Sequence, residues 1–450
     1  MTVAQTLATW ALDLEPRDVP SAVRHAATRH IADGIGNALA ARRLHEADFA
    51  LALAARFAAN PPASIIGGGD AGIEGATFAN GVLIHALDYD DTHPDALIHV
   101  TAAALPAAMA CTEAAGGSID DLITTTIVGY EIAARIGMAT PHGFHRRGFH
   151  ATSVVGALTA AFVAARATGL SPELTVASVG IAGSMSSGSL EFLNSPASTK
   201  QIHPGWSGMA GVMAANLAKE GATGPGTILE GTNGILALFS DTPADLSAIT
   251  AELGTRWETE RISIKPYPVC QLSHASLDAA RTLPPIDPSQ IARVEVVLPE
   301  DAEAIVAIPT SAKLAPRSSY EAKFSVQWDV ATLLIDGEVG VDAFTETNLT
   351  RGDIKRLAEI VEVTTVPFDR PPANAPGHII VHTRDGNTFE GTVPQSRGSV
   401  DAPLSDDAVY DKLVSNTASE GVASTVQGLL ANGSAPVSDL LAATTLQGAA

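Results

Sequence analysis

Histidine and aspartate are concentrated in one short part of the sequence. Between His85 and His99, seven of the fifteen residues are His or Asp, within the run NGVLIHALDYDDTHPDALIH. Such groups can bind a metal ion, transfer protons without one, or form a polar turn, since Asp is common at helix ends. No HExxH motif and no paired CxxC motifs are present. We therefore favour a metal-free acid/base or substrate-binding site over a metal bound by His85, Asp88 and Asp91.

Two further segments carry candidate groups. His150 precedes an apolar run in GFHRRGFHATSVVG, close to Arg146 and Arg147. An arginine pair beside a helix N-terminus suits a carboxylate or a phosphate, and a solvated basic loop is the alternative. Lys200 follows the Ser- and Thr-containing run SGSLEFLNSPAST. In so acidic a chain this lysine is a candidate carboxylate anchor, with an ordinary surface lysine as the alternative.

The segment ISIKPYPVCQLSHASLDAA places His274 near the predicted start of a helix. A helix N-terminus favours the neutral imidazole that a general base requires. Cys270 lacks the signature of a catalytic nucleophile, so we interpret it as a buried structural thiol. The glycine-rich run IIGGGDAG (65–72) has neither GxGxxG spacing nor a Walker lysine, and it predicts a turn.

Charge and apolar runs exclude several classes of partner. The chain has 27 basic and 49 acidic residues, a formal net charge of −22, which argues against nucleic acid and anionic membranes. The longest uncharged apolar run, residues 151–165, is shorter than the roughly 20 residues of a membrane span. Two cysteines and no signal-peptide pattern predict a cytoplasmic location. An anionic substrate would need local Lys, Arg or His.

Hydrophobic periodicity divides the chain into two kinds of structure. Residues 1 to about 265 predict successive helices, and abundant Ala and Gly favour close helix packing. Later segments predict a strand at 291–299, a helix ended by Gly337, and a hairpin at 378–394 around Asp385-Gly386. We therefore predict a mainly α protein with an α+β lid: a helical domain of residues 1–268 and 398–450, and a lid of residues 269–397. The cleft between them is the expected small-molecule site.

Six segments, taken in this order, resemble the MmgE/PrpD family, which includes 2-methylcitrate dehydratase, cis-aconitate decarboxylase and iminodisuccinate epimerase. They are NGVLIHALDYDDTH, GYEIAARIG, RRGFHATSVVGALTAA, the loop ending at Lys200, KPYPVCQLSHASLDAA and YEAKFSVQW. The resemblance implies a large all-helical domain, a smaller α+β lid, a homodimer, and neither a metal nor an organic cofactor.

The resemblance also implies a set of site residues, transferred motif by motif. His150 and His274 would act as acid and base, with Asp88 orienting a histidine. Lys200 and His99 would bind substrate carboxylates, and Thr92 would donate a hydrogen bond to substrate. The chain departs from the decarboxylase pattern in one place, because His93 replaces a Trp and no Pro follows His99.

The implied function is that of a cofactor-independent lyase. We expect it to dehydrate a small hydroxy-polycarboxylate such as 2-methylcitrate. The alternatives are epimerisation of an iminodisuccinate-like compound or decarboxylation of a cis-aconitate-like one, since all three reactions pass through a carbanion beside a carboxylate. A ligand-binding protein that kept the scaffold and a metal-dependent hydratase are the alternatives from other classes. The full set of ionisable residues argues against the first of these.

Overall fold

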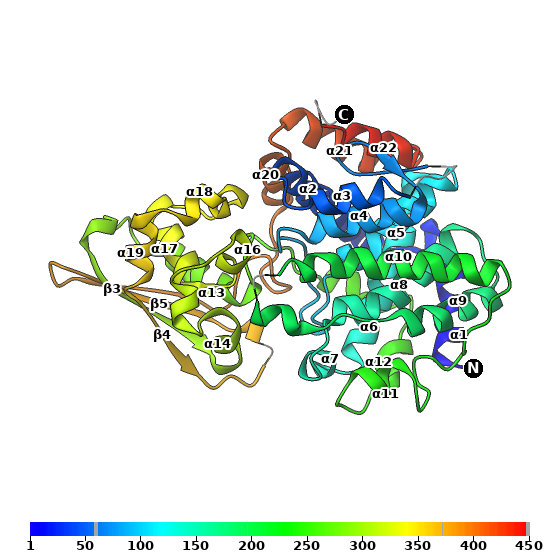
Figure 1. Cartoon of the computed structure of the whole chain (residues 1–450), viewed down its shortest axis with the longest axis horizontal. Helices are drawn as coiled ribbons and strands as arrows, with labels where there is room; N and C mark the ends of the chain where they lie inside the picture. The colour runs from blue at the N-terminus through cyan, green and yellow to red at the C-terminus, as the bar shows by residue number, and fades with distance from the viewer. Residues whose placement is uncertain (58–61, 196, 371, 447–450) are drawn as a thin grey trace.

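Two bodies of secondary structure lie side by side, a large one made of helices and a smaller one built around a sheet (Figure 1). This is a computed structural model, and it describes residues 1–57, 62–195, 197–370 and 372–446. The predicted fold class, mainly α with a smaller α+β part, is confirmed. The domain boundaries given above remain a prediction.

Most of the long helices belong to the large body. Its helices are α1 (Val3–Asp13), α2 (Ser21–Arg43), α3 (Asp48–Ala54), α4 (Ile73–His85), α5 (Val100–Ala114), α6 (Ile119–Met138), α7 (Gly143–Arg146), α8 (Ala151–Ala167), α9 (Pro172–Met185), α10 (Thr199–Lys219), α11 (Ile235–Phe239), α12 (Leu246–Thr250), α20 (Asp406–Thr417), α21 (Glu420–Ala431) and α22 (Val437–Ala443). The hairpin β1 (Ala63–Ser64) and β2 (Asp70–Ala71) encloses the glycine-rich run, confirming the predicted turn.

Helix α8 is the centre of this body, as its apolar sequence predicts. It packs against α5, α6, α9 and α10, and residues 151–165 are all buried. Small residues allow such close packing. A Cβ atom on Gly81 of α4 would lie 2.7 Å from the Cα atom of Gly205 of α10, so neither position of this crossing accepts a larger residue without a shift. None of the described helices is long and apolar enough to span a membrane.

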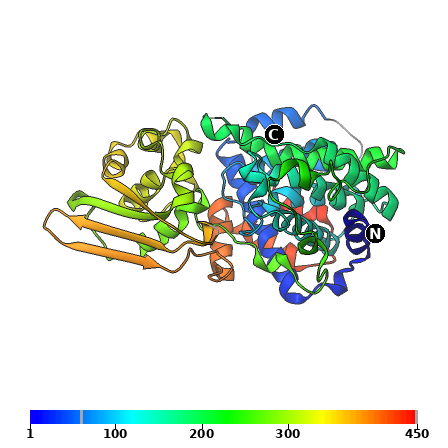
Figure 2. The same ribbon diagram turned by 90° about the horizontal axis from the view of Figure 1, so that it is seen from below.

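The smaller body has a four-stranded sheet with the order β4-β3-β5-β6. Its elements are α13 (Gln271–Arg281), β3 (Ile291–Pro299), α14 (Glu300–Val306), α15 (Thr310–Lys313), α16 (Ser319–Ala322), α17 (Val326–Asp336), α18 (Glu346–Leu349), α19 (Gly352–Ala358), β4 (Val361–Val366), β5 (Gly377–Thr383) and β6 (Thr388–Val393). Helices α13 and α17 pack against it, and Figure 2 shows the helices on one side of the sheet.

The sequence predicted several of these elements. The strand at 291–299, the hairpin around Asp385-Gly386 and the helix ended by Gly337 are all confirmed. Gly337 adopts φ 78°, the left-handed conformation that ends many helices. Strand β4 was not predicted. It pairs in parallel with β3, so its partner is far away in sequence.

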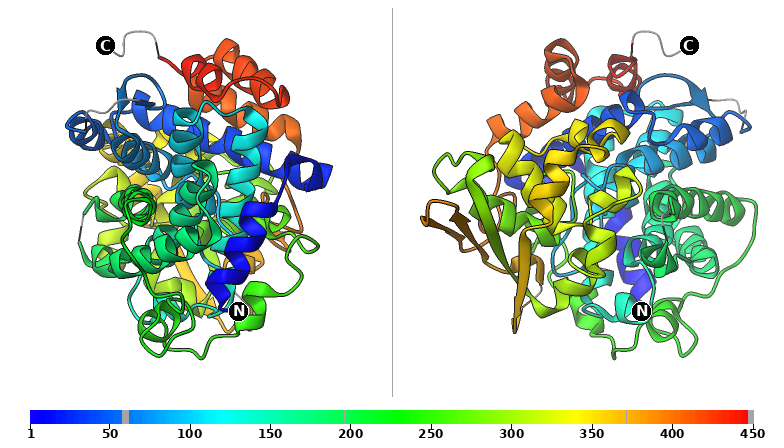
Figure 3. Two further views of the ribbon diagram at one scale, coloured as in Figure 1. Left: turned by 90° about the vertical axis from the view of Figure 1, so that its right-hand side faces the viewer. Right: turned by 60° about the vertical axis from the view of Figure 1, so that its left-hand side comes forward.

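The C-terminal helices return to the large body. Helix α20 packs against α2, and Figure 3 shows the orange and red helices beside the blue ones. Lys412 of α20 lies with its Nζ atom 2.6 Å from a carboxylate oxygen of Asp33. The same ammonium group donates hydrogen bonds to the backbone carbonyls of Tyr89 and Lys265. One side chain therefore ties two loops of the site to a late helix.

Candidate active site

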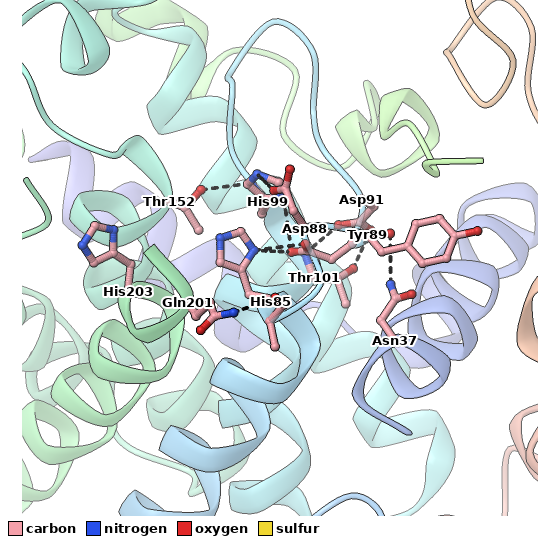
Figure 4. Close-up of polar contacts among 12 residues, drawn as sticks. Asn37, His85, Asp88, Tyr89, Asp91, His99, Thr101, Thr152, Gln201 and His203 are labelled. Carbon is pink, nitrogen blue, oxygen red and sulfur yellow. Dashed lines mark hydrogen bonds and ion pairs between the residues drawn. The ribbon is translucent and has the colours of Figure 1, made fainter. Parts of the chain in front are cut away.

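Three buried helices begin at the same place in the large body. His99 immediately precedes α5, His150 immediately precedes α8, and Lys200 lies in the first turn of α10. The loop that follows α4 supplies Asp88 and Asp90 to the same region (Figure 4). Helix N-termini carry partial positive charge, so this convergence favours a negatively charged ligand.

Asp88 lies between two ammonium groups. Its carboxylate oxygens lie 2.5 Å from Nζ of Lys200 and 3.2 Å from Nζ of Lys265, and all three side chains are buried. Burial favours a raised pKa for Asp88, but the two lysines outweigh burial and hold the pKa well below its ordinary value. Burial likewise opposes the charge on Lys200, yet Asp88 raises the pKa of that lysine. Asp88 also has φ 52°, a strained conformation for a residue other than glycine.

Asp90 holds two imidazoles. One of its carboxylate oxygens lies 2.9 Å from Nδ1 of His85 and 3.2 Å from Nδ1 of His99. Burial favours a raised pKa for Asp90, but the two imidazoles keep the pKa well below its ordinary value. Burial lowers the pKa of His85 to about 4, so this ring is neutral at pH 7. Its Nε2 atom is buried and has no hydrogen-bond partner among the described residues.

A second pair of imidazoles lies beside the first. Nδ1 of His150 is 3.0 Å from Nδ1 of His203, and the His85 and His150 rings are stacked with centroids 5.8 Å apart. Burial lowers the pKa of His150 well below its ordinary value and that of His203 to about 4. Both imidazoles are therefore neutral at pH 7, the form in which a ring nitrogen can accept a proton.

Thr92 has a hydroxyl group without a partner. Its backbone pairs with Ser263, which fixes the loop, whereas its Oγ1 atom is buried and has no hydrogen-bond partner among the described residues. Such a group usually costs free energy unless a water molecule or a ligand completes its hydrogen bonding. Its position fits the predicted role of binding substrate, which remains a prediction.

His274 is buried in the first turn of α13 but is separate from the other imidazoles. Its Nε2 atom is 3.1 Å from the carbonyl oxygen of Val269, and its ring packs edge-on against Tyr267. Burial and the nearby ammonium group of Lys265 lower the pKa of His274 to about 3. The structure therefore brings together Asp88, His99, His150 and Lys200, with His274 beside Lys265.

The arginine pair predicted as an anion anchor lies outside this cluster. Arg146 and Arg147 are exposed, and Arg146 pairs with Asp241 at 3.1 Å. Their exposure fits the alternative given above, a solvated basic segment, rather than an anion site beside His150.

The arrangement of possible metal ligands also differs from the one considered from the sequence. Asp91 lies 2.7 Å from Nδ1 of His30 and bonds to Thr101, so it is not part of a set with His85. Two other sets offer one ligand atom per residue, all within 4.8 Å of one another. They are His85, His99 and His150, and His85, Asp88, Asp90 and His99. The expected absence of a catalytic metal remains a prediction.

Sequence analysis missed several members of this site. Lys265 and Asp90 lie in segments that carried the resemblance, but their partners depend on the fold. Tyr320 also lies in such a segment, YEAKFSVQW. Its hydroxyl is buried without a hydrogen-bond partner among the described residues. Burial raises the pKa of Tyr320 well above its ordinary value, against the opposing effect of the Lys200 charge. His203, which contacts His150, lies three residues after Lys200 and was not predicted as part of the site.

A cavity of about 1250 Å³ lies between the two bodies, and some of its lining residues neighbour the cluster. Phe192 and Gln201 line it from the large body, and Tyr320 and Phe324 line it from the smaller one. The ring of Phe192 is 5.8 Å from that of His203, and the ring of Phe324 is 5.2 Å from Nζ of Lys200. The inner wall of the cavity therefore contacts the charged cluster, as expected for an entrance to the site.

Two models of known protein-family domains match the chain. Residues 5–246 match the model of the MmgE/PrpD N-terminal domain, and residues 267–428 match that of the MmgE/PrpD C-terminal domain. Since these matches cover most of the chain, the protein belongs to the MmgE/PrpD family. The predicted family is thereby confirmed.

Individual relatives share one described activity. Human cis-aconitate decarboxylase is 28% identical over 372 residues, covering 79% of this chain and 75% of the human protein. Cis-aconitate decarboxylase of Aspergillus terreus is 26% identical over 433 residues, covering 91% of this chain and 88% of that protein. The cis-aconitate decarboxylase-like protein oryM of Aspergillus oryzae is 26% identical over 438 residues, covering 91% and 89% respectively.

Proposed function

We propose that this protein is a lyase that acts on a small polycarboxylate through a carbanion beside a carboxylate group. The observation that supports this most strongly is the buried Lys200–Asp88–Lys265 arrangement next to neutral imidazoles. Two ammonium groups beside one carboxylate leave local positive charge in a chain whose net charge is −22. Negative charge that develops on a substrate is best stabilised by such fixed groups in a site without bulk water.

In this proposal, Lys200 and His99 bind substrate carboxylates. Thr92 donates a hydrogen bond from its unpaired hydroxyl to the substrate. Asp88 keeps Lys200 charged and in place, and it lies 3.9 Å from Nε2 of His99. The N-termini of α5, α8 and α10 add partial positive charge around the same anion. The imidazoles are then left to move protons rather than to supply most of the positive charge.

Decarboxylation is the leading reaction, because the relatives named above are described as cis-aconitate decarboxylases. In that reaction the bond to one carboxylate carbon breaks and CO₂ leaves, while the electron pair spreads into the double bond and a remaining carboxylate. The carboxylates of the bound substrate raise the pKa of His150, so this ring takes up a proton on binding. It then delivers that proton to carbon. A trianion and one proton thus yield a dianion and CO₂.

Dehydration of a 2-methylcitrate-like substrate is the second candidate. The contact between His150 and His203 favours it, since one ring can remove a proton from carbon while a protonated neighbour assists loss of hydroxide. His274 serves in this proposal as a further proton-transfer group. A hydrogen bond from its Nε2 to Val269 leaves Nδ1 as its acceptor nitrogen. Epimerisation of an iminodisuccinate-like compound ranks third.

The departure from the decarboxylase pattern at His93 does not change this order. The ring of His93 is buried, accepts a hydrogen bond from the backbone of Ala96, and lies 3.3 Å from Glu258. These contacts of His93 stabilise its own loop. Within the described residues, none of the hydrogen bonds or ion pairs of His93 involves Lys200, His99 or His150. A homodimer and a cytoplasmic location remain part of the proposal, supported by the resemblance and by the composition.

The test is an NMR-monitored incubation of chelator-treated protein in D₂O with cis-aconitate, 2-methylcitrate, citrate and iminodisuccinate. Release of CO₂ with deuterium in the product supports decarboxylation. Loss of water from a hydroxy acid supports dehydration instead, and deuterium uptake without elimination supports epimerisation. A Lys200→Gln variant serves as the control for contaminating activity. If none of the four compounds changes, the proposed substrate class is wrong.

A further inference from the structure

Two imidazoles of the cluster, those of His85 and His150, have Nδ1 in a hydrogen bond, and Nδ1 of the third, His99, lies close to a carboxylate. Nδ1 of His85 and Nδ1 of His99 lie 2.9 and 3.2 Å from Asp90, and Nδ1 of His150 lies 3.0 Å from His203. A neighbour at Nδ1 fixes the orientation of a ring and leaves its Nε2 atom as the free ligand. Carboxylates hold metal-binding histidines in this way.

The spacing of the three rings fits a single ion. One ring nitrogen from each of His85, His99 and His150 lies within 4.8 Å of the others. The ring centroids are 4.5, 5.8 and 6.0 Å apart. Metal–nitrogen distances of about 2.0–2.1 Å and tetrahedral angles place the centroids about 5 Å apart, so only small side-chain shifts are needed.

An unpaired nitrogen points to a ligand. The side chain of His85 is fully buried, and its Nε2 atom has no hydrogen-bond partner among the described residues. Figure 4 shows the His85 ring lying next to that of His99. A buried imidazole nitrogen without a partner costs free energy unless something completes its bonding. Nothing in the proposed acid/base scheme uses His85.

The chemistry of the donors selects the type of ion. Asp88 is paired with Lys200 and Lys265, so it is not available as a ligand, and three imidazoles remain. Imidazole suits zinc, copper, nickel and cobalt, whereas Mg²⁺ and Ca²⁺ require oxygen ligands.

We propose that His85, His99 and His150 form a site for one divalent transition-metal ion of this class, such as Zn²⁺ or Co²⁺. The ion would bind to His99 and His150. In the proposed function, His99 binds a substrate carboxylate and His150 transfers a proton. Its binding would therefore inhibit turnover, a consequence that rests on the proposed function. Binding of the ion itself does not depend on that function.

The experiment is a titration of chelator-treated, dialysed protein with Co²⁺, followed by visible absorption. We expect one ion per chain, with the intense bands of four-coordinate Co²⁺. Zn²⁺ should displace it and Mg²⁺ should not. The His85→Asn variant should bind Co²⁺ at least about tenfold more weakly, and Asp90→Asn should weaken binding roughly 10–100-fold because it orients two ligands.

The matched control is His25→Asn. His25 also pairs with a carboxylate, that of Asp406 at 3.0 Å, but it is exposed on the surface. Its loss should leave Co²⁺ binding unchanged. Circular dichroism and thermal melting establish which variants fold, and His99→Asn replaces His85→Asn if the latter does not. Absence of saturable binding, or unchanged binding in a folded His85 or His99 variant, overturns the proposal.

Inhibition is measured separately on an active preparation. Zn²⁺ at a saturating concentration should stop turnover, and a chelator should restore it. Full turnover while the absorption shows a saturated site would overturn the inhibitory consequence but not the binding. If no substrate is found, the Co²⁺ titration still decides whether the site exists, so the two proposals fail independently.

Discussion

Two fully buried aspartates, one in each body of the protein, have opposite electrostatic properties. Asp88 in the large body lies between Lys200 and Lys265, and its pKa is well below the ordinary value. Asp329 of α17 in the smaller body accepts no hydrogen bond at either oxygen from the described residues. Burial raises its pKa well above the ordinary value, and Lys313 and Lys323 are near but do not offset this effect.

The difference shows that burial alone does not decide whether a carboxyl group is charged. Direct contact with two ammonium groups makes Asp88 a stable anion, whereas the same side chain without direct partners is held neutral. The charged aspartate lies where helix N-termini and imidazoles meet. The neutral one lies inside an apolar core that contains Trp328 and Val330. Each can be changed to asparagine, which has nearly the same shape and no charge.

Asp88→Asn should have the largest effect. It leaves two buried ammonium groups without their carboxylate, so the free energy of unfolding at pH 7 should fall by roughly 3–5 kcal/mol. Because the folded-state pKa of Asp88 is lowered, its contribution is present above its ordinary pKa of 3.8 and is lost as the pH falls through the folded-state value. Urea unfolding from pH 3 to 7 measures this.

The control for Asp88→Asn is Asp401→Asn, at an exposed position, which should leave the stability nearly unchanged. A loss at Asp88 no larger than at Asp401 would contradict the interpretation of Asp88 as a paired buried anion.

Lys200→Met should lower kcat/KM roughly 10²–10³-fold on the substrate identified above, because fixed positive charge near the developing anion is lost. Lys219→Met is the matched control, since Lys219 is exposed in the last turn of the same helix. Steady-state kinetics on both variants provide the comparison. A loss of only a few-fold at Lys200 would show that Lys265 or the helix N-termini suffice.

Asp329→Asn should have an effect of opposite sign, which is small near pH 4 and grows as the pH rises. The raised folded-state pKa means that the contribution of Asp329 is fully present below pH 3.8 and is lost as the pH rises toward the folded-state value. The wild type should therefore lose stability relative to the variant by at most about 1.4 kcal/mol per pH unit above pH 4. Urea unfolding from pH 4 to 8 tests this, and a constant difference over that range would contradict it.

Thr92→Val should have the smallest effect, and only on activity. The hydroxyl has no partner in the free protein, so its removal should not lower the free energy of unfolding. Loss of one hydrogen bond to substrate should reduce kcat/KM about tenfold. Thermal melting and steady-state kinetics separate the two effects. A marked loss of stability would show that the hydroxyl is used within the folded chain.

Local patterns in the sequence predicted most of the fold. Helical periodicity, the Asp385-Gly386 turn and the glycine after α17 are properties of a few neighbouring residues. Strand β4 escaped prediction because its pairing with β3 joins residues 294–299 to residues 361–366. No local pattern specifies such a parallel partner.

The site could be predicted only in part for the same reason. The residue types in LDYDDTH indicated acid/base chemistry, but not which partner each carboxylate takes. Asp88 binds lysines, Asp90 binds imidazoles, and Asp91 binds His30 and Thr101. These partners come from five different segments, so only the folded chain distinguishes them. For the arginine pair the sequence left open an anion anchor and a solvated basic loop, and only the fold shows that Arg146 and Arg147 are exposed.

The contact of Lys412 with Asp33 and with the carbonyls of Tyr89 and Lys265 has a consequence for the newly made protein. At roughly 5–20 residues per second, synthesis from residue 88 to residue 412 takes roughly 15–65 s. During that time the loop with Asp88 is not yet bound by Lys412. The carboxylate of Asp33 and the carbonyl of Tyr89 also lack the contact that Lys412 later makes. A nascent chain stalled before α20 should therefore be cleaved by protease in residues 86–99, a segment that is protected once α20 has been made.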